Sequence, residues 1–200
     1  MRTRSLFVAA ILLITSAVGA QAQNAYTPWS EPVNLGAPVN TSVSEFFPCV
    51  SKDGLSLYFT STGDVTRPSL GGFDIYVSRR PGLDAPWGPP ENLGEPINSP
   101  YDDVSPMLTI DGHRMYFASN RPGGLGGNDI YVSRRHNKRD DFAWRVPLNV
   151  GEGVNTPANE AGPFVFEDET TGTIMLYFDS NRPDGLGPYT DDAVHNGNDI

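Results

Sequence analysis

The sequence predicts an all-β fold built from a repeated four-stranded unit, on three observations. Runs of four to seven β-branched and aromatic residues recur along the chain, bounded by Asp-Gly, Pro-Gly, Gly-Gly and Asn-Gly. After the N-terminal apolar run, no stretch has the i, i+3, i+4, i+7 spacing of an amphipathic helix. The pattern Trp-x-x-Pro-x-Asn-x-Gly begins at Trp29, Trp87 and Trp144, at offsets of 58 and 57 residues. Four antiparallel strands repeated at this interval are typical of the blades of a β-propeller.

Each unit is expected to hold its four strands in the same order. In the first unit they are expected around residues 46–51, 57–61 and 74–79, with an outer strand near 87–93. The first two strands are joined by Asp53-Gly54, which predicts a tight hairpin because glycine accepts a positive φ. The second unit has the same Asp-Gly turn, and the third has a longer one. The units span about residues 40–94, 98–151 and 155–200, the last of them incomplete.

Residues 29–35 match the outer strand of a unit, although they precede any inner strand. In closed propellers such a leading strand commonly completes the last blade, so that no edge is left exposed. About three blades are visible, whereas closed rings have roughly four to eight. The third unit stops at Ile200, within a strand that continues to Arg135 in the second. The sequence therefore indicates a C-terminally truncated fragment that forms an incomplete ring.

The N-terminus has the features of a signal peptide over residues 1–22. Arg2 and Arg4 precede an apolar run, and small residues favour cleavage after Ala22. The run is shorter than the roughly 20 residues that span a bilayer. The only cysteine, Cys49, lies far from the run, which argues against a lipid anchor and excludes an internal disulfide. We expect residues 23–200 to be exported to the periplasm or the extracellular space, with no membrane span.

Composition limits the classes of partner. The chain is 38% apolar and 19% charged, which suits a single globular domain. Its 24 acidic residues against 14 basic ones give a formal charge of -10, which becomes -12 once the two leader arginines are removed. This charge repels phosphate backbones and anionic lipid headgroups, so nucleic acid is excluded as a partner.

Three motifs connect the repeat with a known family. They are Pro48-x-x-Ser51-x-Asp53-Gly54-x-x-Leu57-Tyr58-Phe59, Ser119-Asn120-Arg121-Pro122-Gly123-Gly124 and Asp129-Ile130-Tyr131-Val132-Ser133. They resemble the TolB-type, WD-repeat-like β-propeller repeats of periplasmic proteins that often carry OmpA-type domains. The resemblance covers nearly all of residues 29–200 and implies a periplasmic or extracellular interaction module. Fold alone does not settle function.

Glu45, Asp103 and Glu160 are the candidate binding residues. Each stands three places before the repeat proline, at the expected start of an innermost strand, so in a ring they would point toward one mouth of the channel. Such carboxylates could bind a cation or a basic peptide, or protonate a glycosidic oxygen. The alternative is that they accept hydrogen bonds from neighbouring backbone, which recurrence in every unit favours. A glycosidase also needs two carboxylates held at a defined separation, and nothing in the sequence marks such a pair.

A glycine-rich loop in each unit suggests a structural ion pair. Arg121 and Asp129 flank Gly123–Gly127, and Arg182 and Asp199 repeat them, so each pair is expected to close its loop. The first unit has threonine at the matching place and offers Arg67 instead, which predicts a less firmly closed loop. The glycines also resemble calcium-binding nonapeptides, but those stack every nine residues and these do not.

No catalytic residue, metal site or cofactor is indicated. His113, His136 and His195 share no repeat position and have no metal-ligand spacing, and the sequence has no Gly-x-Ser-x-Gly, P-loop or Cys-x-x-Cys motif. Cys49 aligns with Met107 and Phe164, which predicts a buried, unreactive thiol.

The sequence thus favours an exported, non-catalytic β-propeller that binds an envelope protein, a peptide or a glycan as a scaffold module. The alternative is an enzyme: the propeller domain of a secreted glycosidase, or of a serine peptidase whose catalytic part lies outside this chain.

Overall fold

The computed structural model describes residues 29–64, 67–168 and 170–183. All regular secondary structure in these ranges is β-strand, which confirms the all-β prediction. Within the described residues there is no helix long and apolar enough to cross a membrane. The chain divides into two compact units, Met1–Val33 and Asn34–Ile200, and the second contains every strand. The predicted signal peptide lies outside the described residues.

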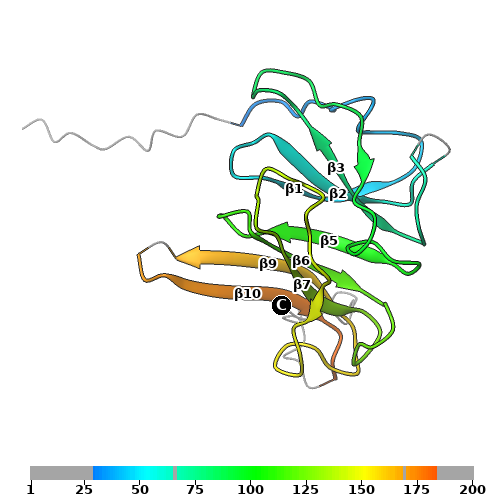
Figure 1. The fold of residues 1–200 in the computed structure, drawn as a ribbon, viewed down its shortest axis with the longest axis vertical. Coiled ribbons are helices and arrows are strands. Elements are labelled where there is room, and N and C mark those ends of the chain that lie inside the picture. The colour runs from blue at the N-terminus through cyan, green and yellow to red at the C-terminus, as the bar shows by residue number, and fades with distance from the viewer. Residues whose placement is uncertain (1–28, 65–66, 169, 184–200) are drawn as a thin grey trace, which may run out of the picture. The chain divides into compact units, whose positions relative to one another are not determined.

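The strands form three antiparallel sheets in chain order (Figure 1). The first sheet has the order β1 (Glu45–Val50), β2 (Ser56–Ser61), β3 (Asp74–Arg79) and β4 (Glu91–Asn92). The second repeats it with β5 (Asp103–Leu108), β6 (Arg114–Ser119), β7 (Asp129–Arg134) and β8 (Leu148–Asn149). In the third, β9 (Glu160–Asp168) pairs with β10 (Thr173–Ser180). The four-stranded repeat is confirmed for the first two units.

The first hairpin of each sheet turns at a glycine with positive φ, as predicted: Gly54 (73°), Gly112 (72°) and Gly172 (71°). In the first turn Asp53 Oδ1 accepts hydrogen bonds from Ser51 Oγ at 2.7 Å and from the Leu55 amide at 3.1 Å. The aspartate therefore holds the turn from inside while glycine supplies the backbone conformation.

The outer strands are shorter than predicted. We expected a strand near 87–93, but β4 contains only Glu91 and Asn92. Pro89 and Pro90 directly precede it, and proline has no amide hydrogen for a ladder. Residues 29–35 form no strand among the described residues. Ladder hydrogen bonds require a neighbouring strand, and no described strand pairs with this segment.

A β-bulge interrupts the inner strand of the first two sheets. The register between β1 and β2 shifts between Phe46 and Cys49, and β5 shifts at the same repeat position. Phe47 (φ 53°) and Ser105 (φ 57°) adopt the left-handed conformation there. Each precedes the repeat proline, which cannot donate to the ladder, so the bulge falls where pairing is already interrupted.

The sheets pack face to face through their inner strands. Strand β5 contacts β1, β2 and β3, and β9 contacts β5, β6 and β7. The core between the first two sheets includes Tyr58 and Ile75 from one side and Leu108, Met115 and Phe117 from the other. The inner strands β5 and β9 therefore lie against the face of the sheet before them (Figure 1).

Candidate functional site

Each repeat carboxylate lies at the start of an inner strand and pairs with an arginine. The three pairs are Glu45 with Arg67, Asp103 with Arg121 at 2.5 Å, and Glu160 with Arg182 at 3.3 Å. The side chains of Asp103 and Glu160 are fully buried, and that of Glu45 is 11% exposed. The three candidate binding residues are thus equivalent in structure as well as in sequence.

A serine or threonine four places earlier donates two hydrogen bonds to each carboxylate. Thr41, Ser99 and Thr156 donate from both the side-chain oxygen and the backbone amide, at 2.6–3.2 Å. The same 58- and 57-residue offsets relate these three residues, so the repeat comparison contained this signal although our prediction missed it. Each carboxylate therefore receives an arginine, a hydroxyl and an amide from its own chain.

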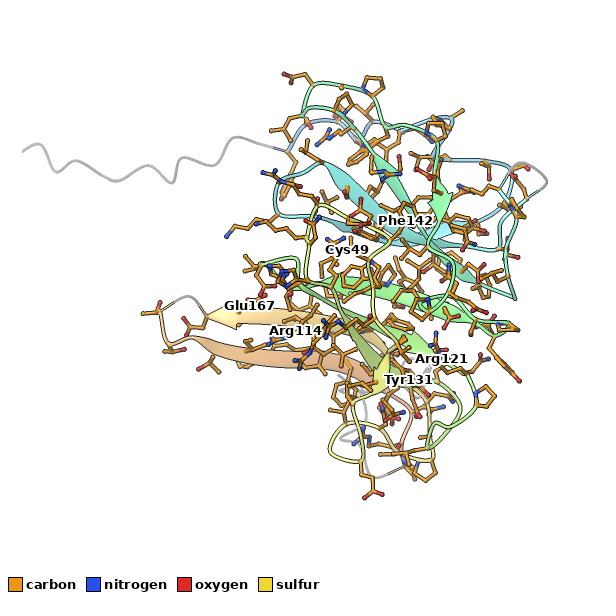
Figure 2. All side chains as sticks on the ribbon, in the orientation of Figure 1. Cys49, Arg114, Arg121, Tyr131, Phe142 and Glu167 are labelled. Carbon is orange, nitrogen blue, oxygen red and sulfur yellow. The ribbon has the colours of Figure 1, made fainter. Side chains whose placement is uncertain are left out.

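The arginines are held as firmly as the carboxylates. Arg121 Nε donates to Ser119 Oγ at 3.0 Å, and Nη2 donates to the Ile97 carbonyl. Its guanidinium lies 5.1 Å from the ring centre of Phe117 and 5.2 Å from that of Tyr131. Figure 2 labels Arg121 and Tyr131 near each other. Such cation–π contacts stabilise a desolvated arginine. The guanidinium is therefore fixed by hydrogen bonds and by packing against two aromatic rings.

The expected pairing of Arg121 with Asp129 is wrong, because Arg121 takes Asp103 instead. Asp129 accepts hydrogen bonds from the amides of Leu125 at 2.5 Å and Gly126 at 3.3 Å, and from Asn149 Nδ2 at 2.9 Å. The amides of the glycine loop bond to Asp129. Arg121 is therefore free to pair with Asp103 at the start of the inner strand. Arg182 likewise pairs with Glu160, and Asp199 lies outside the described residues.

In the first unit Arg67 supplies the arginine that the alignment lacks, and residues 65–66 of its loop lie outside the described residues. Arg67 comes from a different place in its loop but bonds to Glu45, Ser61 and the Val39 carbonyl as Arg121 bonds to their equivalents. Its side chain is only 4% exposed, against 14% for Arg121 and 24% for Arg182. A residue outside the repeat alignment therefore fills the same structural position.

Electrostatics argue against acid catalysis at Glu45. Burial raises the pKa of this carboxyl, but hydrogen bonds from Thr41 and Arg67 outweigh it and leave the pKa below its usual value. A general acid must keep its proton near neutral pH, and Glu45 does not. Among the described residues no group of three or more His, Cys, Asp or Glu side chains is placed to hold a metal ion. The geometry fits our alternative interpretation, in which these carboxylates bond to their own chain.

Asparagines connect successive units through the edge of the third strand. Asn98 Oδ1 accepts from the Ile75 amide at 2.9 Å, while its Nδ2 donates to the Ile75 carbonyl at 2.8 Å and to Asn92 Oδ1 at 2.7 Å. Asn155 makes the same three bonds to Ile130 and Asn149. We call this arrangement the amide clamp. The repeat of Asn40, Asn98 and Asn155 was evident in the sequence, but its role required the structure.

The turns above the carboxylates form a polar surface that we call the rim, made of Tyr101, Asp102, Asn120, Asn159 and Asn181. Asn120 Oδ1 accepts from the Asp102 amide at 2.8 Å, and Asn181 Oδ1 accepts from the Asn159 amide at the same distance. The amide side chains are exposed, and Tyr101 is 44% exposed beside them. Exposed amides with a neighbouring aromatic ring can bind a polar ligand.

Cys49 lies between the first and second sheets (Figure 2). The thiol is partly rather than fully buried, packs on the core and accepts a hydrogen bond from the Leu108 amide at 3.4 Å. Burial raises its pKa, and the bond from Leu108 only partly offsets that.

Comparison with known proteins shows no family for this chain. No family model and no curated protein matches the chain. Among solved structures, it is similar to an α-L-arabinofuranosidase from Lactobacillus brevis, with 21% identity and a TM-score of 0.48. The match covers 72% of this chain and 47% of that structure, so the chain spans about half its length. A likeness at this level says nothing about the activity of the chain.

Proposed function

We propose that the sheets are blades of a β-propeller of the TolB type, and that the chain is an exported, non-catalytic module that binds a protein of the cell envelope. The proposal rests on one observation: the repeat carboxylates are already hydrogen-bonded by groups of the chain itself. Asp103 and Glu160, both fully buried, and Glu45 each bond to an arginine, a hydroxyl and an amide of the chain itself. Carboxylates engaged in this way hold the fold together rather than act on a substrate.

The rim is the binding surface in this proposal. Its exposed groups are the three asparagine amides and the Tyr101 ring, beside the partly buried carboxylate of Asp102, and they suit a polypeptide with polar and basic groups. The acidic balance of the chain also favours a basic partner through long-range attraction.

Co-sedimentation with isolated cell envelopes tests this function. We expect the mature chain to sediment with the envelopes, to lose binding after protease treatment of the envelopes, and to bind more weakly when Tyr101→Ala is introduced. Leu83→Ala is the matched control, because Leu83 is also exposed and lies outside the rim. Binding that survives the protease treatment would point to a glycan and overturn the proposed protein partner.

Activity assays test the enzyme alternative. We expect no turnover of aryl glycosides or peptide substrates. Turnover that Glu45→Gln abolishes in a folded protein would show that an inner-strand carboxylate is catalytic and would overturn the proposal.

A further inference from the structure

A groove of about 170 Å³ separates the hairpin turns of the first two sheets. It is lined by residues 51–53 of one turn, by residues 110–112 of the other, and by Arg135 and Lys138. The two turns follow the ends of β1 and β5, whereas Tyr101 and Asp102 of the rim precede the start of β5. The groove therefore lies at the opposite end of these strands from the rim, and the proposed function assigns it no role.

Arg135 is a buried cation with one donor nitrogen left over. Its side chain is 2% exposed and pairs with Asp141 at 2.7 Å through Nη1, while Nε donates to the Gly112 carbonyl at 2.8 Å. The other terminal nitrogen, Nη2, has no hydrogen-bond partner in the part of the chain that the structure describes. It lies 3.8 Å from the point that a Cβ of Gly112 would occupy, so it is close to the turn that lines the groove. A donor without an acceptor on a side chain this buried indicates a place for an acceptor atom of a ligand.

Lys138 places a second cation in the groove with Arg135. Counted from the arginine, it holds the position that Leu83 holds after Arg80 in the first unit. The two arginines are equivalent, since each donates from Nε to the glycine carbonyl of its hairpin turn, at 2.7 and 2.8 Å. Leu83 covers its glycine with an apolar side chain, and Lys138 covers Gly112 with one that ends in an ammonium group. The fold accepts leucine at this position, so packing does not account for the charge.

Asp53 and Asp111 supply two carboxylates to the same groove. Hydrogen bonds within its turn lower the pKa of Asp53, and the charge of Lys138 lowers it further. Burial raises the pKa of Asp111, but hydrogen bonds from its own turn outweigh that and leave the pKa below its usual value. In both residues Oδ1 accepts these bonds, and Oδ2 has no hydrogen-bond partner among the described residues. Each aspartate is therefore ionised at neutral pH with one oxygen left for a ligand.

The next junction along the chain shows how a carboxylate lies between two turns. Glu167 of β9, labelled in Figure 2, accepts a hydrogen bond from the Ile110 amide at 2.5 Å. In the repeat, Glu167 aligns with Ile110, which aligns with Lys52, at offsets of 57 and 58 residues. At the first junction the side chain that corresponds to Glu167 is thus that of Ile110, which carries no acceptor. The chain fills the second junction with a carboxylate of its own and supplies none from this position to the groove at the first.

We propose that the groove binds a small free α-amino acid, whose carboxylate lies against Arg135 and Lys138 and whose ammonium group lies against Asp53 and Asp111. Both ends of such a zwitterion find a counter-charge. A simple anion would also meet the two aspartates, and a simple cation would also meet the arginine and the lysine. At about 30 Å³ per water molecule, the groove of about 170 Å³ holds the volume of roughly six waters, which suits glycine or alanine.

Titration of the isotope-labelled mature chain with glycine, followed by NMR, tests the site. We expect saturable shifts of the Asp53, Gly112 and Lys138 amide signals, with a dissociation constant of about a millimolar because the ligand is so small. Acetate and methylammonium carry only one of the two charges. Each should bind at least about tenfold more weakly than glycine, because each leaves two charged groups of the groove without a counter-charge.

Two variants each remove one charge from the groove. Lys138→Leu introduces the residue that the first unit has at this position, and Asp53→Asn keeps the Oδ1 acceptor of its turn, so both should fold. Each should weaken glycine binding by about tenfold. Arg139→Leu is the matched control, because Arg139 is exposed, carries the same charge as Lys138 and lies outside the groove.

Glycine shifts that do not saturate, or acetate binding as tight as that of glycine, would overturn the inference. So would an unchanged affinity in both variants, or an equal loss in Arg139→Leu. The rim lies at the other end of the strands, so Lys138→Leu should leave co-sedimentation with envelopes unchanged, and the two proposals can fail separately.

Discussion

Tyr58 in β2 donates its phenolic hydrogen to Asp141, although 83 positions separate the two residues in the chain. Asp141 also accepts from Arg135 at 2.7 Å and from Ser56 Oγ at 3.0 Å, and all four groups lie at the junction of the first sheet with the segment that follows β7. Tyr58 and Asp141 are buried, so the network joins the first two units within the protein interior. The repeat comparison aligns Asp141 with Asp84, three places before the repeat tryptophan, but only the structure shows that Asp141 accepts from Tyr58.

Tyr58→Phe should lower the free energy of unfolding by about 1–2 kcal/mol at neutral pH, because Asp141 loses one of its donors. Urea unfolding measures the change. Tyr101→Phe is the control: Tyr101 is largely exposed, and its substitution should leave stability unchanged. An equal loss in the two variants would contradict the assigned role of the Tyr58 hydroxyl.

The same pair predicts a dependence on alkaline pH. Burial, followed by the negative charge of Asp141, raises the pKa of Tyr58 above its ordinary value. The unfolded state therefore releases this proton first, so stability is present below about pH 10 and is lost as the pH rises further. The wild type should lose stability more steeply above that pH than Tyr58→Phe, as measured by urea unfolding. Parallel pH profiles of the two proteins would contradict the prediction.

Asp103→Asn should lower the free energy of unfolding by about 3–5 kcal/mol, because it leaves the Arg121 guanidinium without its buried counter-charge. The control is Glu91→Gln, which breaks the surface pair with Arg79, and its cost should stay below about 1 kcal/mol. Thermal or urea unfolding compares the two. Equal costs would show that the pair contributes no more than an exposed one.

The strands were predictable because each unit has runs of β-branched and aromatic residues between glycine turns. The same alignment marked Glu45, Asp103 and Glu160 as equivalent. The alignment could not show which carboxylate binds Arg121. The choice depends on which strand and which loop amides lie near each carboxylate in the folded chain. The role of Arg67 was harder to predict, because it pairs with Glu45 although it does not align with Arg121 and Arg182 in the repeat.

Nothing in the sequence at Phe47 predicted the β-bulge there. Phenylalanine is typical of regular strands and disfavours a positive φ, yet the backbone adopts one there. The equivalent Ser105 and Gly162 share the conformation, so the position in the repeat decides it rather than the residue type.

Asn98→Ala should cost about 1–3 kcal/mol in the free energy of unfolding, since the buried amide of Ile75 loses its acceptor, while the Ile75 carbonyl keeps the Leu93 amide as a donor. Asn137→Ala is the comparison, because Asn137 is exposed and accepts from the Arg139 amide in a surface turn. Its cost should be well under half as large. Amide hydrogen exchange at Ile75 should accelerate in Asn98→Ala and stay slow in Asn137→Ala, and slow exchange in both would contradict the clamp.

Cys49 should react slowly with iodoacetamide under native conditions. Burial raises the pKa of the thiol, so at mildly alkaline pH the reactive thiolate is scarcer than in an ordinary cysteine. Partial burial between two sheets also limits access to the sulfur. The rate, followed by mass spectrometry, should rise sharply when urea unfolds the chain. A native rate equal to the unfolded rate would show that the junction does not protect Cys49.

Gly71→Ala should destabilise the contact between the first two units. A Cβ atom at this position would lie 2.6 Å from the Pro100 carbonyl carbon and 2.8 Å from the Ser99 oxygen, both of them backbone atoms that lead into β5. Backbone cannot give way as a flexible side chain can, so we expect a cost of about 1–3 kcal/mol from the forced shift. Gly82→Ala is the matched control, because its Cβ would meet no atom within 4 Å and its φ is not in the left-handed region. That change should be neutral or slightly stabilising, since alanine restricts the unfolded chain. Urea unfolding of the two variants measures the difference, and equal stabilities would show that the glycine loop does not make the close approach that the structure assigns to it.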